Sequence, residues 1–270
     1  MTVPIDPLDL AGKTAIVTGG GTGIGAETAR IFVRNGIDGV VLAARTEADL
    51  QKVKVELEDL GRDVGNPGVQ VLAVRTDVKS EESVAAMVAA TVAEFGRIDI
   101  LVNNAGGTRM GPLEQTPTKA WDSVFDLNAK GPFLCTREAG KHMIAAGRGT
   151  IVNLSSGAGV TGVRYGAGYS AAKAALQMFT RVTAAEWGRH GIRANCIAVG
   201  GIASERASAA WEVAGLDQEA LGKHTALGRI GVPSDIGHAI LFLASDMSSY
   251  VSGQTFSVDG GPLLGGPSDD

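Results

Sequence analysis

Strand-like and helix-like segments alternate along nearly the whole chain of 270 residues. The strand-like runs are rich in β-branched residues and apolar throughout, as expected of strands in a sheet that is covered on both faces. The predicted strands are 14–18, 40–44, 69–74, 99–103, 150–154, 193–198 and 255–259, and the predicted helices are 24–35, 46–60, 80–95, 117–146, 168–189 and 234–245. This alternation predicts an α/β fold, a doubly wound, Rossmann-like parallel sheet of about seven strands with helices on both faces.

No linker, internal repeat or break in composition interrupts this order, so residues 1–270 are predicted to form a single domain with its core at about 10–262. The segment 200–232 departs from the alternation. It begins GGIASERASAAWEVAG, continues as a polar stretch, and is predicted to leave the core with one or two short helices. Long excursions from compact domains are often lids or binding loops, so we expect this one to border the substrate.

Composition argues against several classes of protein. The net charge is −5 and no Lys/Arg cluster stands out, which argues against a nucleic-acid partner. The four histidines are scattered, and Cys135 and Cys196 are predicted to be buried free thiols rather than a disulfide or metal pair. The sequence MTVPIDPLDLAG lacks the basic and apolar regions of a signal peptide, and no run approaches the ~18 apolar residues that span a bilayer. We therefore expect a cytoplasmic protein without a metal site or a membrane partner.

A glycine-rich turn, TGGGTGIG at residues 18–25, follows the first predicted strand and opens the first predicted helix. In that position backbone N–H groups can approach a pyrophosphate at the helix N-terminus. The turn lacks the Lys-Ser/Thr of a nucleoside-triphosphate loop, and its glycine spacing departs by one residue from the common dinucleotide fingerprint. We predict a dinucleotide site that uses Gly19, Thr22, Gly23, Ile24 and Gly25; the alternative is a tight turn without a ligand.

The end of the second predicted strand bears on which dinucleotide binds. An acidic residue there would hold the ribose 2′-OH of NAD, whereas an arginine accommodates the 2′-phosphate of NADP. The strand ends in Ala43-Ala44-Arg45, which favours NADP(H) and leaves NAD(H) as the alternative. Arg45 would otherwise be a solvated surface residue. Asp77 follows the third predicted strand, where its carboxylate could accept a hydrogen bond from the adenine amino group or cap the next helix.

Further motifs stand at the predicted carboxyl ends of the strands, where ligands bind in open α/β sheets. They are NNAG at 103–106, Asn128 in FDLNAKGPF, Ser156 thirteen residues before YSAAK at 169–173, and VSGQTFSVDGG at 251–261. Together with TGGGTGIG, and in this order, they resemble the compact single-domain group of the short-chain dehydrogenase/reductase family. The resemblance covers roughly residues 10–262.

The resemblance implies a catalytic set of Asn128, Ser156, Tyr169 and Lys173. It implies hydride transfer between C4 of a nicotinamide and a carbonyl carbon, with Tyr169 delivering or removing the proton. In the family the lysine also binds the nicotinamide ribose, and the asparagine holds a water that links the lysine to solvent. The remaining expected cofactor contacts are Asp77, Val78, Asn104, Ala105, Gly106, Gly200, Ile202 and Ser204, together with Tyr169 and Lys173.

Physical chemistry supports the Tyr169–Lys173 pair independently. Positions four apart lie on one face of a helix, so the lysine ammonium can sit close to the tyrosine hydroxyl. A positive charge there favours the phenolate and is expected to lower the tyrosine pKa towards the value that a general acid/base needs. Ser156 can donate a hydrogen bond to the substrate oxygen as negative charge develops on it. Tyr165 has no lysine four residues later and is expected at the pocket rim, while Ser155 is expected to serve the turn or the packing.

Two positions depart from the family pattern. Val199 stands where the family usually has proline, which puts the rigidity of the turn at Gly200 in question. Thr22 stands where many NADP-preferring members have a basic residue. The preference for NADP therefore depends on Arg45 and the missing acid alone.

The leading functional hypothesis is an NADP(H)-dependent dehydrogenase or ketoreductase that acts on a ketone/secondary alcohol pair. An enoyl- or dienoyl-thioester reductase is the alternative, because GGIASERASAAW resembles the corresponding loop of peroxisomal-type enoyl-CoA reductases; those relatives generally lack Tyr-x-x-x-Lys. A catalytically silent NADP-sensing protein is a second alternative, although such proteins typically lose the Tyr or the Lys.

The substrate pocket is expected at 107–114, 157–165 and 203–222, where Trp211, Val213, Leu216 and Leu221 offer apolar contacts. This lining suits a medium-sized apolar ketone or an acyl thioester. The resemblance also implies a homotetramer, or a homodimer, that pairs through the 168–189 helix and the 251–261 segment.

Overall fold

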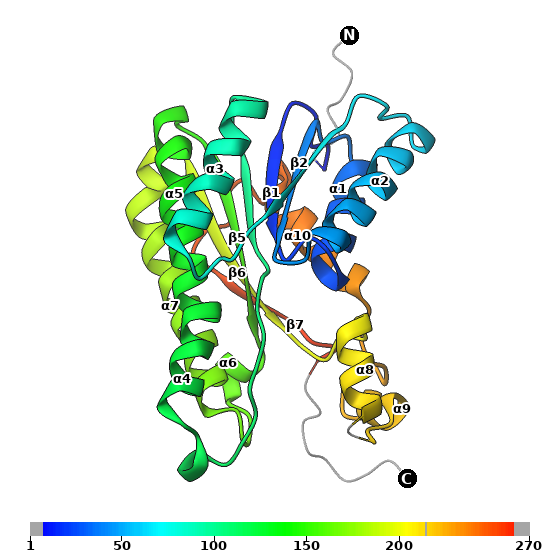
Figure 1. Cartoon of the computed structure of the whole chain (residues 1–270), viewed down its shortest axis with the longest axis vertical. Helices are drawn as coiled ribbons and strands as arrows, with labels where there is room; N and C mark the ends of the chain where they lie inside the picture. Colours follow the sequence, from blue (N-terminus) through cyan, green and yellow to red (C-terminus); the bar gives the residue numbers. More distant parts are fainter. Residues whose placement is uncertain (1–7, 214, 262–270) are drawn as a thin grey trace.

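The computed structural model describes residues 8–213 and 215–261 (Figure 1). Expectations that fall on residues 1–7, on position 214 or on 262–270, including the amino-terminal sequence and the last residue of the predicted core, lie outside the described residues. The described chain forms a parallel sheet of seven strands in the order β3-β2-β1-β4-β5-β6-β7. The strands are β1 Thr14–Thr18, β2 Gly39–Ala44, β3 Gln70–Arg75, β4 Ile100–Asn103, β5 Gly149–Ser156, β6 Ile192–Val199 and β7 Thr255–Val258. The predicted doubly wound sheet is confirmed, and each predicted strand matches within two residues.

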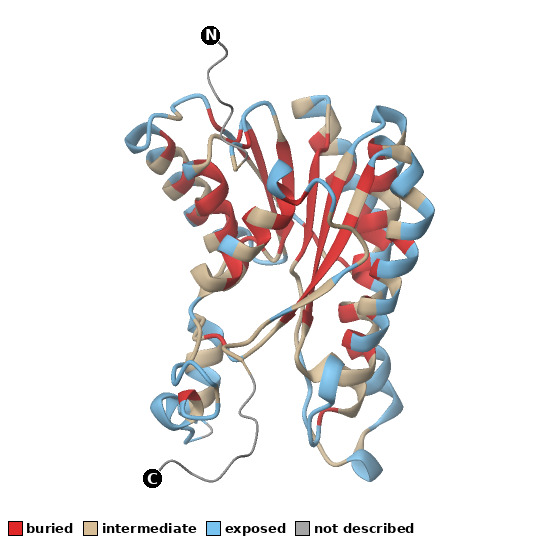
Figure 2. Cartoon of the chain, turned by 180° about the vertical axis from the view of Figure 1, so that it is seen from behind, coloured by how far each residue is buried: buried red, intermediate tan, exposed pale blue. Residues whose placement is uncertain are grey.

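Hydrophobic side chains cover both faces of this sheet, which explains why the strands are apolar throughout. Successive residues of a strand point to opposite faces, so Val17 of β1 joins one core cluster and the adjacent Ile16 joins the other. Helices α1 Gly23–Arg34, α2 Glu47–Asp63 and α10 Pro233–Ala244 close the first cluster. Helices α3 Glu81–Phe95, α5 Gly131–Ala146 and α7 Ala167–Trp187 cover the second. The buried residues accordingly gather along the sheet and on the inner faces of the helices (Figure 2).

Helix α3 begins and ends at residues whose local chemistry accounts for its bounds. The Ser80 side chain accepts a hydrogen bond from the Ser83 N–H at 3.2 Å, as an N-cap does. Glu81 and Glu82 lie in the first turn, where the helix dipole favours negative charge. The helix ends at Gly96, whose φ of 68° is a left-handed conformation that glycine adopts at little cost.

The helical stretch predicted over 117–146 is present from Thr118 to Ala146, but it is not one uniform α-helix. The structure has α4 Thr118–Phe125, then a π-helical turn Asp126–Lys130, then α5. Pro132 has no N–H, so it cannot donate the α-helical hydrogen bond to the carbonyl of Asn128 four residues earlier. The helix therefore changes its hydrogen-bond pattern at Asn128, a residue of the candidate site.

Four short elements were not predicted individually. Helix α6 Ala158–Thr161 follows β5, and 3₁₀ turns occupy Leu113–Gln115, Gly188–His190 and Asp246–Ser248. Each spans at most about one turn, which is too short for hydrophobic periodicity to reveal.

The excursion between β6 and β7 has the short helices that the sequence predicts, α8 Glu205–Val213 and α9 Gln218–Gly222. Ile202 pairs with Gly231 and so joins the two ends of the excursion. Arg229 forms two hydrogen bonds, at 2.7 and 3.0 Å, to Asp235 in the core helix α10. In Figure 1, α8 and α9 extend below the sheet on one side and α4 and α6 on the other. The carboxyl ends of the central strands lie between these two limbs.

Candidate active site

The glycine-rich turn at 18–25 is locked against the NNAG segment. The Thr18 hydroxyl accepts hydrogen bonds from the N–H groups of Asn104 and Ala105, each at 3.0 Å. The Asn104 amide donates to the Thr18 carbonyl at 2.8 Å. At Gly25 an added Cβ atom would lie 2.3 Å from the Gly19 carbonyl oxygen and 2.6 Å from Asn104 Nδ2, so no larger residue fits without a shift. These contacts bring the predicted cofactor residues of two strand ends together.

The turn leaves the first turn of α1 open to a ligand. Thr22 occupies the N-cap position and its side chain makes no capping hydrogen bond. The first N–H groups of an α-helix have no partners within the helix, so these are free to donate to an anion. Ser204, at the start of the excursion, lies against this turn, since a Cβ on Gly23 would be 3.3 Å from Ser204 Cβ. The residues present therefore fit a dinucleotide phosphate at this position.

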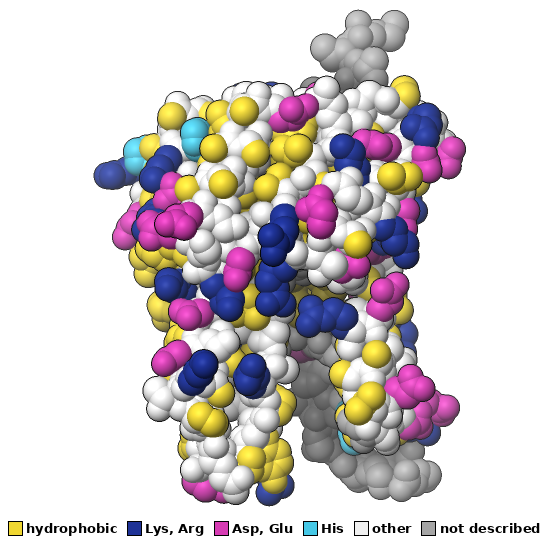
Figure 3. All heavy atoms as spheres, viewed as in Figure 1, with side chains coloured by type: hydrophobic (Ala, Val, Ile, Leu, Met, Phe, Trp, Pro, Cys, Tyr) yellow, Lys and Arg dark blue, Asp and Glu magenta, His cyan; other side chains and the backbone are white. Residues whose placement is uncertain are grey.

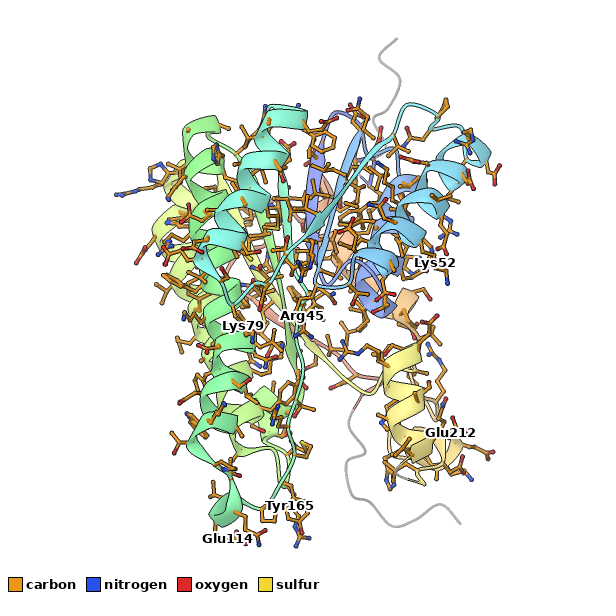
Figure 4. All side chains as sticks on the ribbon, in the orientation of Figure 1. Arg45, Lys52, Lys79, Glu114, Tyr165 and Glu212 are labelled. Carbon is orange, nitrogen blue, oxygen red and sulfur yellow. The ribbon has the colours of Figure 1, made fainter. Side chains whose placement is uncertain are left out.

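Arg45 is exposed just beyond the carboxyl end of β2, where the sequence places it. Its carbonyl accepts a hydrogen bond from Arg75 Nε of the neighbouring strand β3 at 3.3 Å. Lys and Arg side chains gather along the middle of the face drawn in Figure 3, and the same orientation in Figure 4 labels Arg45 there. This part of the surface is suited to an anionic group.

Asp77 follows β3 and makes a local turn. Its Oδ1 atom accepts from the Lys79 N–H at 3.0 Å, and its own N–H donates to Ser83 Oγ at 3.0 Å. Ser80, rather than Asp77, caps α3. The other carboxylate oxygen, Oδ2, lies 3.9 Å from Lys79 Nζ. The capping alternative for Asp77 is thus wrong, and its role toward adenine stays a prediction.

Tyr169, Lys173 and Ser156 meet where α7 crosses the carboxyl end of β5. The Ser156 side chain lies close enough to the Tyr169 hydroxyl to favour its ionised form. Lys173 is buried; its Nζ atom lies 5.7 Å from the centre of the Tyr169 ring and donates to the Leu154 carbonyl at 2.7 Å. Ser156 Oγ also accepts from the Ala158 N–H at 3.2 Å, which fixes the serine at the start of α6. The structure thus groups the three side chains that the sequence predicts to act together.

The prediction that Lys173 lowers the pKa of Tyr169 is wrong for the protein without a bound cofactor. Burial raises the pKa of Tyr169, and the nearby Ser156 side chain opposes that rise only in part. Burial also lowers the pKa of Lys173 to about 8, because a low-dielectric site disfavours the ammonium. The lysine charge therefore does not by itself offset the desolvation of the phenol.

The Asn128 side chain is fully engaged with backbone. Its amide donates to the carbonyls of Gly107 and Val124, both at 2.8 Å, and its oxygen accepts from the Gly107 N–H at 3.3 Å. A Cβ on Gly106 would come within 3.0 Å of Asn128 Oδ1 and 3.3 Å of Lys173 Nζ, so this glycine permits a close approach. The asparagine holds the segment after NNAG against the π-helical turn, and its expected water contact stays a prediction.

Hydrogen bonds to both neighbouring segments hold the Val199–Gly200 turn. The Val199 carbonyl accepts from the Gly157 N–H at 2.9 Å, and the Gly200 N–H donates to the Val258 carbonyl at 3.0 Å. A Cβ on Gly200 would lie 2.5 Å from Asp259 Cα. These contacts hold the turn in the absence of the family's proline, and an effect of Val199 on its rigidity stays a prediction.

Tyr165 occupies an unusual backbone conformation for its type, with a φ of 67°. Its carbonyl accepts from the Gly111 N–H at 2.8 Å and joins the loops after β4 and β5, while its ring lies 4.9 Å from the Arg164 guanidinium carbon and is half exposed. In Figure 4 it lies near Glu114 at the tip of the limb that carries α4 and α6. Its expected place at the pocket rim stays a prediction.

Other chemistries find no support in the part of the chain that the structure describes. Cys135 and Cys196 are free and buried, as predicted, and burial raises their pKa values to about 12 and about 11. No group of three or more His, Cys, Asp or Glu side chains is arranged to hold a metal ion among the described residues. None of the described helices is both long and apolar enough to cross a bilayer.

Comparisons with known proteins agree with this geometry. A family model described as enoyl-(acyl carrier protein) reductase matches residues 19–262. Cis-4-hydroxycyclohexanecarboxylate dehydrogenase of Sinomonas cyclohexanicum is 39% identical over 93% of this chain and 96% of its own. A 3-oxoacyl-[acyl-carrier-protein] reductase of Synechocystis sp. is 36% identical over 94% and 98%. The solved structure of 7α-hydroxysteroid dehydrogenase with NADH and 7-oxo glycochenodeoxycholic acid has a TM-score of 0.88 at 32% identity and covers 97% of this chain and 99% of that one.

Proposed function

This chain belongs to the short-chain dehydrogenase/reductase family of oxidoreductases, and from that premise we propose that it is an NADP(H)-dependent enzyme that interconverts a ketone and a secondary alcohol. The observation that carries the proposal is the grouping of Tyr169, Ser156 and Lys173 at the carboxyl edge of the sheet, beside the open N-terminus of α1. These residues match the chemistry of carbonyl reduction, in which a proton and a hydride are delivered to one C=O group.

A bound nicotinamide cofactor supplies or accepts the hydride in this reaction. Tyr169 then donates a proton to the substrate oxygen during reduction and removes it during oxidation. Ser156 donates a hydrogen bond to that oxygen as its charge develops, and Lys173 favours the ionised phenol by its charge. Gly19, Thr22, Gly23, Ile24 and Gly25 hold the pyrophosphate. The adenosine and the nicotinamide half are held by the remaining predicted contacts, Arg45, Asp77, Val78, Asn104, Ala105, Gly106, Gly200, Ile202 and Ser204.

NADP(H) is proposed over NAD(H) because Arg45 stands where NAD-binding relatives with this fold carry an acid. An arginine can pair with the 2′-phosphate through a charge-assisted hydrogen bond, whereas NAD has no such group. Its exposure leaves the guanidinium free to meet a ligand.

Arg45→Asp is expected to lower kcat/KM for NADPH by about 10- to 100-fold, the effect of losing a hydrogen bond between charged groups, and to raise the relative use of NADH. The measurement is the ratio of kcat/KM values for the two cofactors with one ketone. Arg189→Asp makes the same charge change in the 3₁₀ turn before β6, at the amino edge of the sheet, and is the matched control. An unchanged ratio in Arg45→Asp would discredit the 2′-phosphate assignment.

The substrate is proposed to be a medium-sized apolar carbonyl compound, such as a 3-oxoacyl thioester. Exposed apolar side chains flank the proposed pocket on both limbs; Met110, Val160 and Val163 stand on one side and Val213 and Leu216 on the other. Relatives named for an alicyclic hydroxy acid and for a 3-oxoacyl carrier-protein substrate are compatible with such a pocket.

An enoyl- or dienoyl-thioester reductase is the second candidate, favoured by the description of the matching family model and by the sequence of the excursion. The retained Tyr169 and Lys173 argue for carbonyl chemistry, and they also argue against a silent NADP-binding protein. NADPH oxidation measured with a panel of ketones and enoyl thioesters separates these candidates.

Assembly and location are proposals as well. We expect a cytoplasmic homotetramer or homodimer. Exposed apolar residues on the long helices, Phe133 on α5 and Met178 and Val182 on α7, support pairing through that face.

A further inference from the structure

A two-step hydrogen-bond chain links Gln177, Ser155 and the backbone of Lys173. Gln177 Nε2 donates to Ser155 Oγ at 3.0 Å, and Ser155 Oγ donates to the Lys173 carbonyl at 2.9 Å. Ser155 is buried near the end of β5, immediately before Ser156, and Gln177 lies one turn of α7 beyond Lys173. The chain thus joins the strand end that carries the serine to the helix turn that carries the lysine.

The proton positions in this chain follow from the chemistry of its groups. A serine hydroxyl has one proton to donate, and a glutamine Nε2 can only donate. Because Gln177 donates to Ser155 Oγ, the single proton of Ser155 remains available for the Lys173 carbonyl. Gln177 therefore sets the direction in which Ser155 donates.

Packing keeps this chain in place on two sides. Above it, α6 rests directly on α7: a Cβ on Gly159 would lie 2.8 Å from the Lys173 carbonyl carbon, 2.9 Å from the Ala174 nitrogen and 2.9 Å from Gln177 Nε2. On the strand side, Cys196 of β6 is buried, and its thiol lies near Ser155 and Lys173. A hydrogen bond in such surroundings resists exchange with water better than an exposed one.

We propose that Gln177 and Ser155 are positioning residues for Lys173, which hold its turn of α7 against the end of β5 and so keep the ammonium in register with the Tyr169 hydroxyl. This inference rests on the proposed function, since it assigns a role in the Tyr169 acid/base step. Neither residue touches the reacting atoms. Both act through Lys173, whose Nζ atom already lies only 5.7 Å from the Tyr169 ring centre.

Loosening the Lys173 turn is expected to shift the pKa of Tyr169 in one direction. The ammonium favours the phenolate, and this attraction weakens as the distance grows. Loosening the Lys173 turn should therefore raise the pKa of Tyr169 further. Alcohol oxidation needs the phenolate as base, so its pH dependence should move to higher pH in a loosened variant.

The test compares Gln177→Glu, Gln177→Leu and Ser155→Ala with the wild type in the full-length protein. A carboxylate at 177 accepts rather than donates, so Ser155 would turn its proton away from Lys173. Gln177→Glu, which keeps the size of the side chain, should therefore lower kcat more than the apolar substitution Gln177→Leu. We expect kcat for alcohol oxidation to fall about tenfold in Gln177→Glu and Ser155→Ala and less in Gln177→Leu, as small displacements of catalytic groups do. The midpoint of the pH profile, recorded from about pH 6 to about pH 10, should rise by about half a unit or more.

Gln70→Glu, an exposed change at the start of β3, is the matched control and should leave kcat and the midpoint unchanged. Tm and the NADPH dissociation constant report folding and cofactor binding for every variant. Wild-type kcat and midpoints in Gln177→Glu and Ser155→Ala would overturn the proposal, and so would a loss of kcat that follows a loss of Tm with the midpoint unmoved. Absence of carbonyl or alcohol turnover by the wild type itself would instead overturn the proposed function, and this inference with it.

Discussion

Replacing Tyr169 with Phe is expected to lower kcat by about 10²- to 10⁴-fold, the usual contribution of a positioned general acid/base. The change removes one hydroxyl and keeps the ring, whose position between Lys173 and the end of β5 is set by packing. Cofactor affinity and Tm should therefore stay close to those of the wild type. The measurement is kcat for a responsive ketone with NADPH, alongside an NADPH titration of each protein.

Tyr250→Phe is the matched control, because Tyr250 is fully exposed beyond the 3₁₀ turn Asp246–Ser248. It should keep wild-type turnover. Near-normal turnover in Tyr169→Phe would refute the acid/base role of Tyr169. Loss of NADPH binding together with turnover would point to a structural role instead.

Lys173→Met is expected to lower kcat by about 10²-fold or more, since it removes the charge that favours the phenolate and the proposed contact to the nicotinamide ribose. The NADPH dissociation constant should rise in the same variant. Met resembles Lys in length and suits a buried site, so the helix should persist. The measurement pairs steady-state kinetics with thermal unfolding.

The difference in stability between the wild type and Lys173→Met is expected to depend on pH. Burial lowers the pKa of Lys173 to about 8, below the value of about 10.4 in an unfolded chain. Below pH 8 the lysine is charged in both states, so folding pays the full cost of burying the charge. As the pH rises from about 8 to about 10.4 the folded state loses the proton first and that cost disappears. The wild type should therefore gain Tm relative to Lys173→Met across this interval. A constant difference in Tm, with kcat unaffected, would contradict both roles of Lys173.

The order of the sheet and the edge at which the site lies could be predicted from the sequence. Strands such as 14–18 and 255–259 can be recognised from short, locally apolar runs. Parallel strands with intervening helices then admit few topologies. The grouping of Asn104, Ser156 and Tyr169 follows, because each stands at a carboxyl end of the sheet or on the helix beside it. Residues far apart in the sequence are thereby predicted to lie close together.

The break at Asn128 could not be predicted from periodicity, because Pro132 is tolerated in the first turn of a helix and the apolar pattern continues through it. The change of hydrogen-bond pattern depends on how the Asn128 side chain is held by Val124, one turn earlier, and by Gly107, which lies in the loop after β4. Tertiary contacts decide such features.

The pKa direction of Tyr169 was predicted wrongly for a related reason. Spacing indicates that Lys173 lies nearby, but not how deeply both side chains are buried, and here burial is the larger effect. The contacts of Ser155 and Gln177 were missed because nothing in the sequence distinguishes Gln177 from a solvated helix residue. Only its position one turn after Lys173 hints at a role.

The most direct test of the account follows the hydride itself. NADPH carrying deuterium at the transferring position of nicotinamide C4 is incubated with the protein and a substrate. One incubation contains a ketone or 3-oxoacyl thioester, and a second contains an enoyl thioester. We expect a secondary alcohol with deuterium on the carbinol carbon, formed by the wild type and almost absent with Tyr169→Phe. Deuterium found only in a saturated thioester, or tight NADPH binding without transfer to any carbonyl, would contradict this expectation.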